Sequence, residues 1–213
     1  MSRERKAQAE TVARAFPDLD VALVDRFYEN YGYATPLALV AHLQQLCRTQ
    51  RPEVAIEIGS GLSTAALVAA LPPESTLLSV DESVDWLARA AAGVARPRTA
   101  YIAASGEHGL DFAALNVLLD GLRPGLVFVD GPSQHPRFPP TAVSLYERIV
   151  TSGCVVVVDD TDRPENDAAA IALAGRAQLR KIDYGDPLYT NHRYSILLPA
   201  GVEPLAAFAE PPR

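Results

Sequence analysis

Apolar residues in the middle of the chain occur in short continuous runs, and each run is followed by a stretch with helical periodicity. The runs cover 54–58, 76–80, 99–104, 125–129 and 154–158. Runs that are apolar at nearly every position are typical of strands buried on both faces, as in a parallel sheet built from β–α–β units. The periodic stretches predict helices over 63–71, 83–92, 111–122, 139–150 and 164–177. The pattern therefore predicts an α/β fold with a doubly wound sheet.

The two ends of the chain show different patterns. Helical spacing predicts helices in the first fifty residues, the last of which starts with Thr35 as N-cap and Pro36 in the first turn. Two strand-like runs, 179–185 and 193–199, are joined by a short loop, which predicts an antiparallel pair at the sheet edge. The predicted sheet then has seven strands, most of them parallel. The tail from 200 onward has little pattern, and we expect it to lie over the surface or to fray.

Length and composition favour one domain. We expect a single domain over residues 1–213, with a helical cap over 1–51, an α/β core over 52–199 and a tail over 200–213. A formal net charge of -7 argues against nucleic acid as a partner. No apolar run is long enough for a membrane helix, and the charged opening is unlike a signal peptide, so we expect no membrane partner and a cytoplasmic protein. Cys47 and Cys154 lack the spacing of a metal site and are expected to be buried.

Small and polar residues follow the first predicted strand. Ligands of open α/β sheets bind beyond the carboxyl ends of the strands, so these residues are candidates for cofactor binding. The candidates are Glu57, Gly59, Ser60, Gly61 and Ser63. The glycines allow close backbone approach, and the turn leads into a helix N-terminus. Asp81 ends the second run, where a carboxylate can accept hydrogen bonds from a ribose diol.

Two classes of cofactor fit this arrangement, besides a purely structural turn. A dinucleotide such as NAD calls for a third Gly, or Ala, where this chain has Thr64, and the carboxylate of Glu57 would repel a pyrophosphate. In S-adenosylmethionine, the ammonium of the methionine moiety could instead face Glu57.

Three aspartates end the fourth and fifth predicted strands. Asp130 follows one run, and Asp159 and Asp160 follow the next. Carboxylates gathered at one sheet edge repel one another unless a cation compensates, and their oxygens suit Mg²⁺. The sequence therefore predicts a metal site, with loop hydrogen bonds and helix capping as the alternative role of these acids.

The motif Glu57-x-Gly59-x-Gly61, followed by Asp81, resembles the class I S-adenosylmethionine-dependent methyltransferases. The resemblance implies the strand order 3-2-1-4-5-7-6. It also implies contacts to the cofactor from Tyr33, Thr35, Ser105, Glu107 and Asp130. The acids Asp130, Asp159 and Asp160 are similar to those of Mg²⁺-dependent O-methyltransferases of the catechol and macrocin types, and the Asp-Asp pair is more similar to the latter.

The base of the catechol-type enzymes, a lysine soon after the fourth-strand aspartate, is missing here. The corresponding loop carries His135, whose ordinary pKa suits a general base, so we predict catalytic roles for Asp130 and His135. A solvent-exposed loop histidine is the alternative interpretation of His135. His192, in the loop between the last two strands, could line the pocket from the other side.

The expected activity is methyl transfer from S-adenosylmethionine to a hydroxyl of a small molecule, with Mg²⁺ assistance. The alternatives are a metal-independent N-methyltransferase, an NAD-dependent oxidoreductase and a nucleotide-binding module without turnover. The sequence identifies no acceptor, and it leaves monomer and homodimer both open.

Overall fold

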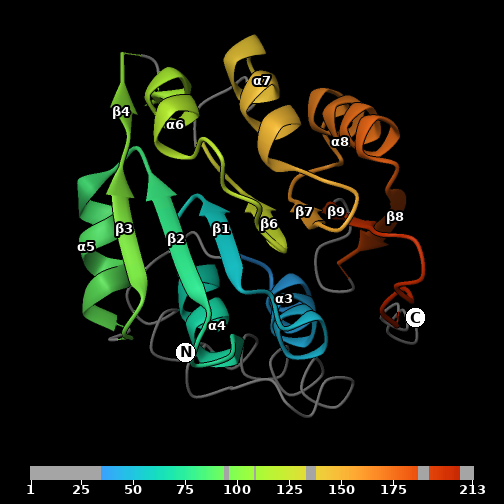
Figure 1. The fold of residues 1–213 in the computed structure, drawn as a ribbon, viewed down its shortest axis with the longest axis horizontal. Helices are drawn as coiled ribbons and strands as arrows, with labels where there is room; N and C mark the ends of the chain where they lie inside the picture. Colours follow the sequence, from blue (N-terminus) through green and yellow to red (C-terminus); the bar gives the residue numbers. More distant parts are fainter. Residues whose placement is uncertain (1–34, 94–95, 108, 133–137, 187–191, 207–213) are drawn as a thin grey trace.

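A seven-stranded sheet forms the centre of the computed structural model (Figure 1). The structure describes residues 35–93, 96–107, 109–132, 138–186 and 192–206. The strands of the sheet are β1 (Val54–Ile58), β2 (Thr76–Asp81), β3 (Thr99–Ala103), β6 (Leu126–Val129), β7 (Val155–Val158), β8 (Arg180–Gly185) and β9 (Arg193–Leu198). Their order is β3-β2-β1-β6-β7-β9-β8, and β9 runs antiparallel to both of its neighbours. The predicted order 3-2-1-4-5-7-6 is thereby confirmed.

Two very short strands form a separate antiparallel ribbon. They are β4 (Ser105–Gly106) and β5 (Gly109–Leu110), and they directly follow β3. The sequence did not predict this ribbon, because two residues are too few to give an apolar run or a period.

Helices cover both faces of the sheet. They are α3 (Leu37–Gln50), α4 (Leu62–Ala70), α5 (Val84–Gly93), α6 (Phe112–Leu118), α7 (Pro140–Ile149) and α8 (Pro164–Ala177). Buried residues of α3 and α4 form one core cluster with one face of the strands, and those of α6, α7 and α8 form a second cluster with the other face. The doubly wound arrangement predicted from the sequence is confirmed.

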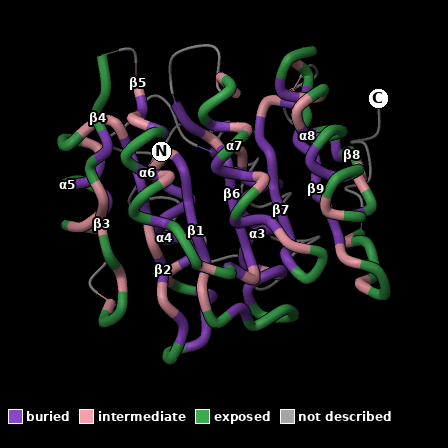
Figure 2. Tube along the Cα trace, turned by 45° about the horizontal axis from the view of Figure 1, so that its top comes forward, coloured by how far each residue is buried: buried purple, intermediate pink, exposed green. Residues whose placement is uncertain are grey.

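Strands β6 and β7, at the centre of the sheet, are buried along their whole length, as their sequence pattern indicates (Figure 2). Every residue of β6 and β7 is buried. Ile56 and Ile58 of β1 belong to one core cluster, whereas Ala55 belongs to the other. Such a strand has no solvent face, which is why its apolar run is continuous rather than alternating.

The start of the described chain corrects one expectation, whereas its end agrees with another. Helix α3 begins after Pro36, and no side chain caps it. The Thr35 hydroxyl lies 3.5 Å from Asp130 Oδ2 instead, so the prediction of Thr35 as N-cap was wrong. The described part of the tail lies over the surface with most residues exposed, and half-buried Val202 and Leu205 pack against the core.

Other expectations have simple outcomes. Cys47 and Cys154 are buried free thiols, as predicted. The helices predicted before residue 35 lie outside the described residues. Among the described helices, none combines the length and the apolar character needed to cross a membrane.

Candidate functional site

The turns after β1 and β6 meet at the carboxyl edge of the sheet. Gly59 has a φ of +98°, in the region that favours glycine, and a Cβ there would lie 2.9 Å from the backbone nitrogen of Gly131. A Cβ on Gly131 would in turn lie 3.0 Å from the nitrogen of Gly59. A side chain at either position would push the two turns apart, so both glycines are needed for this close approach.

Asp81 holds the glycine turn from the end of β2. Its Oδ2 accepts hydrogen bonds from the Ser60 amide at 2.7 Å and the Ser60 hydroxyl at 3.0 Å. Its Oδ1 accepts one from the Ser83 amide at 2.7 Å. A carboxylate has about four acceptor positions, so three bonds leave room for another donor. The sequence predicts Asp81 at this edge, and in the structure it contacts Ser60, another predicted site residue.

Glu57 lies beneath the same turn and is fully buried. Its Oε2 accepts hydrogen bonds from the hydroxyls of Thr64 and Ser79, each at 2.6 Å. Burial raises the pKa of Glu57 to about 7, although hydrogen bonds from Ser63, Ser79 and Thr64 oppose the rise. The carboxyl group thus braces the turn from below, and its expected role toward an ammonium group stays a prediction.

Thr64 has a structural role that was not predicted from the sequence. Its hydroxyl accepts a hydrogen bond from the Gly61 amide at 2.9 Å and donates one to Glu57. Gly61 itself faces open space, since a Cβ there would meet nothing within 4 Å. The spacing of Glu57, Gly61 and Thr64 was the available signal: an acid on a strand and a hydroxyl in the first helical turn can bridge the loop between them.

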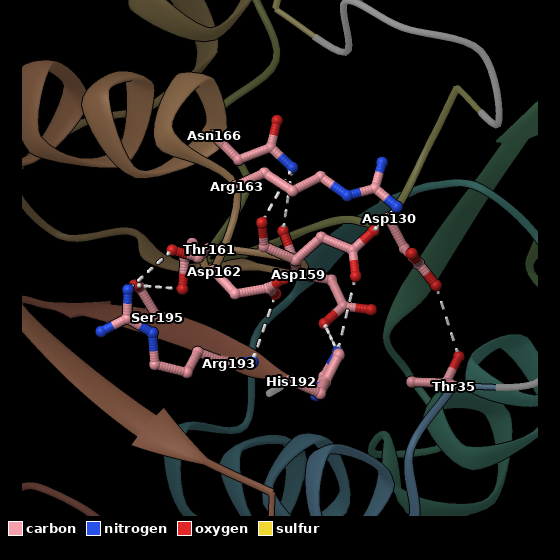
Figure 3. A network of polar contacts seen from close by, with 11 residues as sticks. Thr35, Asp130, Asp159, Thr161, Asp162, Arg163, Asn166, His192, Arg193 and Ser195 are labelled. Atoms are coloured by element: carbon pink, nitrogen blue, oxygen red, sulfur yellow. Dashed lines mark hydrogen bonds and ion pairs between the residues drawn. The ribbon is translucent and has the colours of Figure 1, made fainter. Parts of the chain in front are cut away.

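A second group of polar residues lies beyond β7 (Figure 3). Nε2 of His192 lies 2.8 Å from Oδ1 of Asp159 and 3.7 Å from Oδ1 of Asp160. Burial lowers the pKa of His192, but the carboxylates of Asp159, Asp160 and Asp186 raise it above its ordinary value on balance. Asp159, Asp160 and His192 each offer one atom that could coordinate a metal ion, and these three atoms lie within 4.8 Å of one another.

Asp130 is not a member of this group. Its carboxylate contacts Thr35 (Figure 3), which connects the start of α3 to the site. Of the three acids predicted to bind metal, the structure brings Asp159 and Asp160 together with His192, and the metal role of Asp130 stays a prediction. The signal for His192 was available: a residue that precedes an antiparallel last strand reaches the edge where the parallel strands end.

The loop that carries the two acids is held by neighbouring residues. Asn166, fully buried in the first turn of α8, donates its side-chain amide to the carbonyls of Asp159 at 3.4 Å and Asp160 at 3.2 Å. Asp160 has a φ of +54°, which is uncommon outside glycine. Its Oδ2 lies 3.3 Å from the guanidinium of Arg163.

The other predicted site residues lie farther along the edge or cannot be placed. Ser105 and Glu107 are exposed at the ribbon after β3. Ser105 also lines a groove of about 500 Å³ between the end of β3 and α6, together with Ala104 and Leu118. Tyr33 and His135 lie outside the described residues.

The fold is similar to those of solved methyltransferases. The O-methyltransferase TomG from Streptomyces achromogenes, involved in tomaymycin synthesis and solved with S-adenosylmethionine, matches with a TM-score of 0.65 at 19% identity, over 94% of this chain and 100% of that chain. An O-methyltransferase from Bacillus cereus, solved with S-adenosylhomocysteine, matches with a TM-score of 0.64 at 16% identity, over 90% of this chain and 97% of that chain. A methyltransferase from Podospora anserina, solved with S-adenosylhomocysteine, matches with a TM-score of 0.59 at 15% identity, over 93% of this chain and 97% of that chain.

At the level of sequence, no family model matches the chain and no curated protein matches it. The likeness in structure extends over nearly the whole of each protein. The predicted resemblance to class I methyltransferases is thus confirmed for the fold: this chain has the Rossmann-like methyltransferase fold.

Proposed function

We propose that the chain is an S-adenosylmethionine-dependent methyltransferase that transfers a methyl group to a hydroxyl of a small molecule. The observation that carries the proposal is the carboxylate of Asp81, which ends β2 and holds the glycine turn after β1 through Ser60. In this position a carboxylate can accept hydrogen bonds from a ribose. Asp81 has one acceptor position left, and the Ser60 hydroxyl can rotate away to free a second.

The topology and the turn both disfavour the dinucleotide alternative. The dinucleotide-binding fold has the strand order 3-2-1-4-5-6, without a strand inserted before the last one. Here β9 lies between β7 and β8 and is antiparallel to both. Thr64 stands at the third glycine position of the dinucleotide motif, and its hydroxyl is already bonded to Gly61 and Glu57.

The chemistry of methyl transfer needs little more than alignment. The acceptor oxygen forms a bond to the methyl carbon as the carbon–sulfur bond breaks, the bonding pair stays on sulfur, and the hydroxyl proton leaves to a base. The chain contributes by holding the acceptor in line with the methyl group. A divalent cation beside Asp159 and Asp160 would lower the pKa of the acceptor hydroxyl. His135 stays our prediction for the proton acceptor.

A small neutral or cationic acceptor is favoured over a polyanion, because the chain carries a formal net charge of -7. Asp130, Asp159 and Asp160 add negative charge at the edge where the acceptor would bind. A hydroxylated metabolite that carries few or no phosphate groups is the best match to the negative charge at this edge.

The decisive experiment is equilibrium binding of S-adenosylhomocysteine and of NAD, measured by titration calorimetry on wild type and Asp81→Asn. We expect S-adenosylhomocysteine to bind and NAD not to bind. Loss of a charged acceptor for the ribose should weaken binding by about tenfold to 150-fold, or about 1.5–3 kcal/mol.

The matched control is Asp85→Asn, which removes the same charge from an exposed position in the first turn of α5. It should leave the affinity unchanged. Equal affinities for wild type and Asp81→Asn would contradict the role of Asp81, and tight NAD binding would favour the oxidoreductase.

A further inference from the structure

The two edge strands of the sheet differ in charge. Strands β3 and β8 lie at opposite edges (Figure 1). β8 carries Arg180, Lys181 and Asp183, and charged side chains on an edge strand keep other chains from pairing with it. β3 (Thr99–Ala103) contains no charged residue and no proline. The edge at β3 therefore lacks the residues that protect the edge at β8.

The backbone of β3 offers hydrogen-bonding groups on its outer side. Among the described strands, only β2 pairs with β3. The carbonyl of Arg98, just before β3, accepts from the Leu77 amide of β2 at 3.0 Å. Successive residues of a strand direct their N–H and C=O groups to opposite sides, so those of Thr99, Tyr101 and Ala103 point away from β2. Another strand can pair with these three residues.

An exposed apolar surface on α6 adjoins this edge. Val117 and Leu118 are 79% and 56% exposed. Both line the groove of about 500 Å³ beside the end of β3, together with Ile102 and Ala103. Exposed apolar residues that lie together often mark an interaction site. The outer side of β3 and these two residues of α6 thus form one continuous surface, which we call the β3–α6 edge.

The outer side of β3 is complementary to itself. In an antiparallel pair centred on Tyr101, this residue lies opposite the Tyr101 of a second copy, and Thr99 lies opposite Ala103. Each of these residues directs both of its backbone polar groups outward, so each can exchange two hydrogen bonds with the residue opposite. A two-fold interface requires a surface that is complementary to itself in this way.

The charges that flank β3 favour the same orientation. Arg96 and Arg98 precede the strand, whereas Glu107 and Asp111 follow it. Antiparallel pairing brings the start of one strand beside the end of the other, so the basic residues of each copy lie near the acidic residues of the second. Parallel pairing would bring like charges together. Charge complementarity of this kind selects the partner and its orientation.

We propose that the β3–α6 edge binds a second copy of this chain, with the two β3 strands antiparallel and centred on Tyr101. The two sheets then form one continuous sheet. Stable interfaces bury about 1,200–2,000 Å² in total, which is more than two five-residue strands supply, so Val117 and Leu118 must also be covered. We expect a dissociation constant in the micromolar range. The dimer is independent of the proposed function, because no cofactor takes part in it.

The first test is sedimentation equilibrium of the full chain without ligand, from low micromolar to near-millimolar concentration. We expect a reversible equilibrium of monomer and dimer. Leu118→Glu should weaken the dimer at least tenfold, because a carboxylate would be removed from water in the interface. The matched control is Ile171→Glu on α8, since Ile171 is also 56% exposed and lies outside the β3–α6 edge. It should leave the dissociation constant unchanged.

The second test checks the register by disulfide formation under mild oxidation. Tyr101→Cys should form a covalent dimer, because residues opposite each other in a hydrogen-bonded pair have Cα atoms about 5.5 Å apart, within the range of a disulfide. Thr99→Cys is the control. Two such cysteines would lie about 13 Å apart, too far to join. Cys47 and Cys154 are buried, so wild type should not cross-link.

Three results would overturn the proposal. The first is a wild-type protein that stays monomeric at every concentration, which would leave the edge to a different partner. The second is a dimer that Leu118→Glu does not weaken, or that Ile171→Glu weakens equally. The third is cross-linking of Thr99→Cys as fast as that of Tyr101→Cys. Circular dichroism checks that each variant folds, and Val117→Glu, at a more exposed position, replaces Leu118→Glu if the latter does not fold.

Discussion

At the scale of single residues, two buried acids beside one glycine turn have different environments. Asp81 accepts hydrogen bonds from two backbone amides and a hydroxyl and lies at the edge of the sheet. Glu57 accepts bonds only from hydroxyls and is fully buried. Burial raises the pKa of Glu57 to about 7. Asp81 is therefore the better candidate for contact with a ligand, and Glu57 contributes to the stability of the turn.

The raised pKa of Glu57 predicts a pH dependence of stability. The unfolded chain releases this proton near pH 4.5 and the folded chain near pH 7, so folding stability from this group is lost as pH rises between these values. Glu57→Gln cannot titrate, and its amide oxygen can still accept from Thr64 and Ser79. As the pH rises from 4.5 to 8, we expect the free energy of unfolding of Glu57→Gln to increase relative to that of wild type by up to about 3 kcal/mol.

Urea unfolding of both proteins across this pH range measures the difference. Glu53→Gln, which changes an exposed glutamate just before β1, is the control and should show no such trend. A difference between wild type and Glu57→Gln that does not change with pH would refute the raised pKa.

At the scale of elements, the junction between β7 and α8 decides how the two aspartates are presented. The first turn of α8 contains Asn166, whose side-chain amide bonds to the carbonyls of Asp159 and Asp160. Arg163, just before α8, pairs with Asp160. One helix start thus fixes both the backbone and one side chain of the acidic loop.

Asn166→Ala should therefore destabilise the protein and loosen the loop. The buried carbonyl of Asp159 would lose a donor, which costs about 1–3 kcal/mol, whereas the half-buried carbonyl of Asp160 keeps its bond from the Arg163 amide. We expect the thermal midpoint to fall. Glu165→Ala, an exposed change in the same turn, serves as comparison, and equal thermal midpoints for the two variants would contradict the role of Asn166.

Most elements could be predicted because their patterns are local. The runs at β6 and β7 are buried on both faces and remain apolar throughout, and α8 has the bounds 164–177 that its periodicity predicts. Thr35 was predicted as an N-cap from its local sequence alone. Its hydroxyl instead contacts Asp130, which lies 95 residues away, and no local pattern indicates that contact. The ribbon β4–β5 was missed because four strand residues carry no period.

At the scale of the whole molecule, the candidate site is assembled from segments far apart in the sequence. Strand ends could be predicted to converge, so Asp81, Asp159 and Asp160 were found from the sequence. The grouping of His192 with the two aspartates depends on side-chain directions and on the pairing of β9 with β7. The position of His192 just before the last strand predicts that it lies near this edge, but not which acids it contacts.

The same long-range assembly produces a buried histidine that joins three segments. His42 of α3 lies 2.8 Å from the hydroxyl of Tyr194 in β9 through Nδ1, and 3.1 Å from the Ala206 carbonyl through Nε2. A carbonyl can only accept, so Nε2 carries the proton and Nδ1 accepts from Tyr194. The neutral ring therefore satisfies both contacts, and a second proton on Nδ1 would reverse the bond to Tyr194, whose hydroxyl would then accept.

His42 should accordingly make the fold sensitive to acid. Burial lowers its pKa from 6.5 to about 4, although the Ala206 carbonyl opposes this. The unfolded chain then binds more protons than the folded chain between pH 4 and 6.5, so stability from this group is complete above pH 6.5 and is lost as pH falls toward 4. The advantage of wild type over His42→Gln should shrink by about 3 kcal/mol between pH 7.5 and pH 4. Urea unfolding of wild type and His42→Gln at the two pH values measures this change in stability. If NMR showed the His42 imidazole titrating near pH 6.5 in the folded protein, His42 would not join the three segments as a neutral ring.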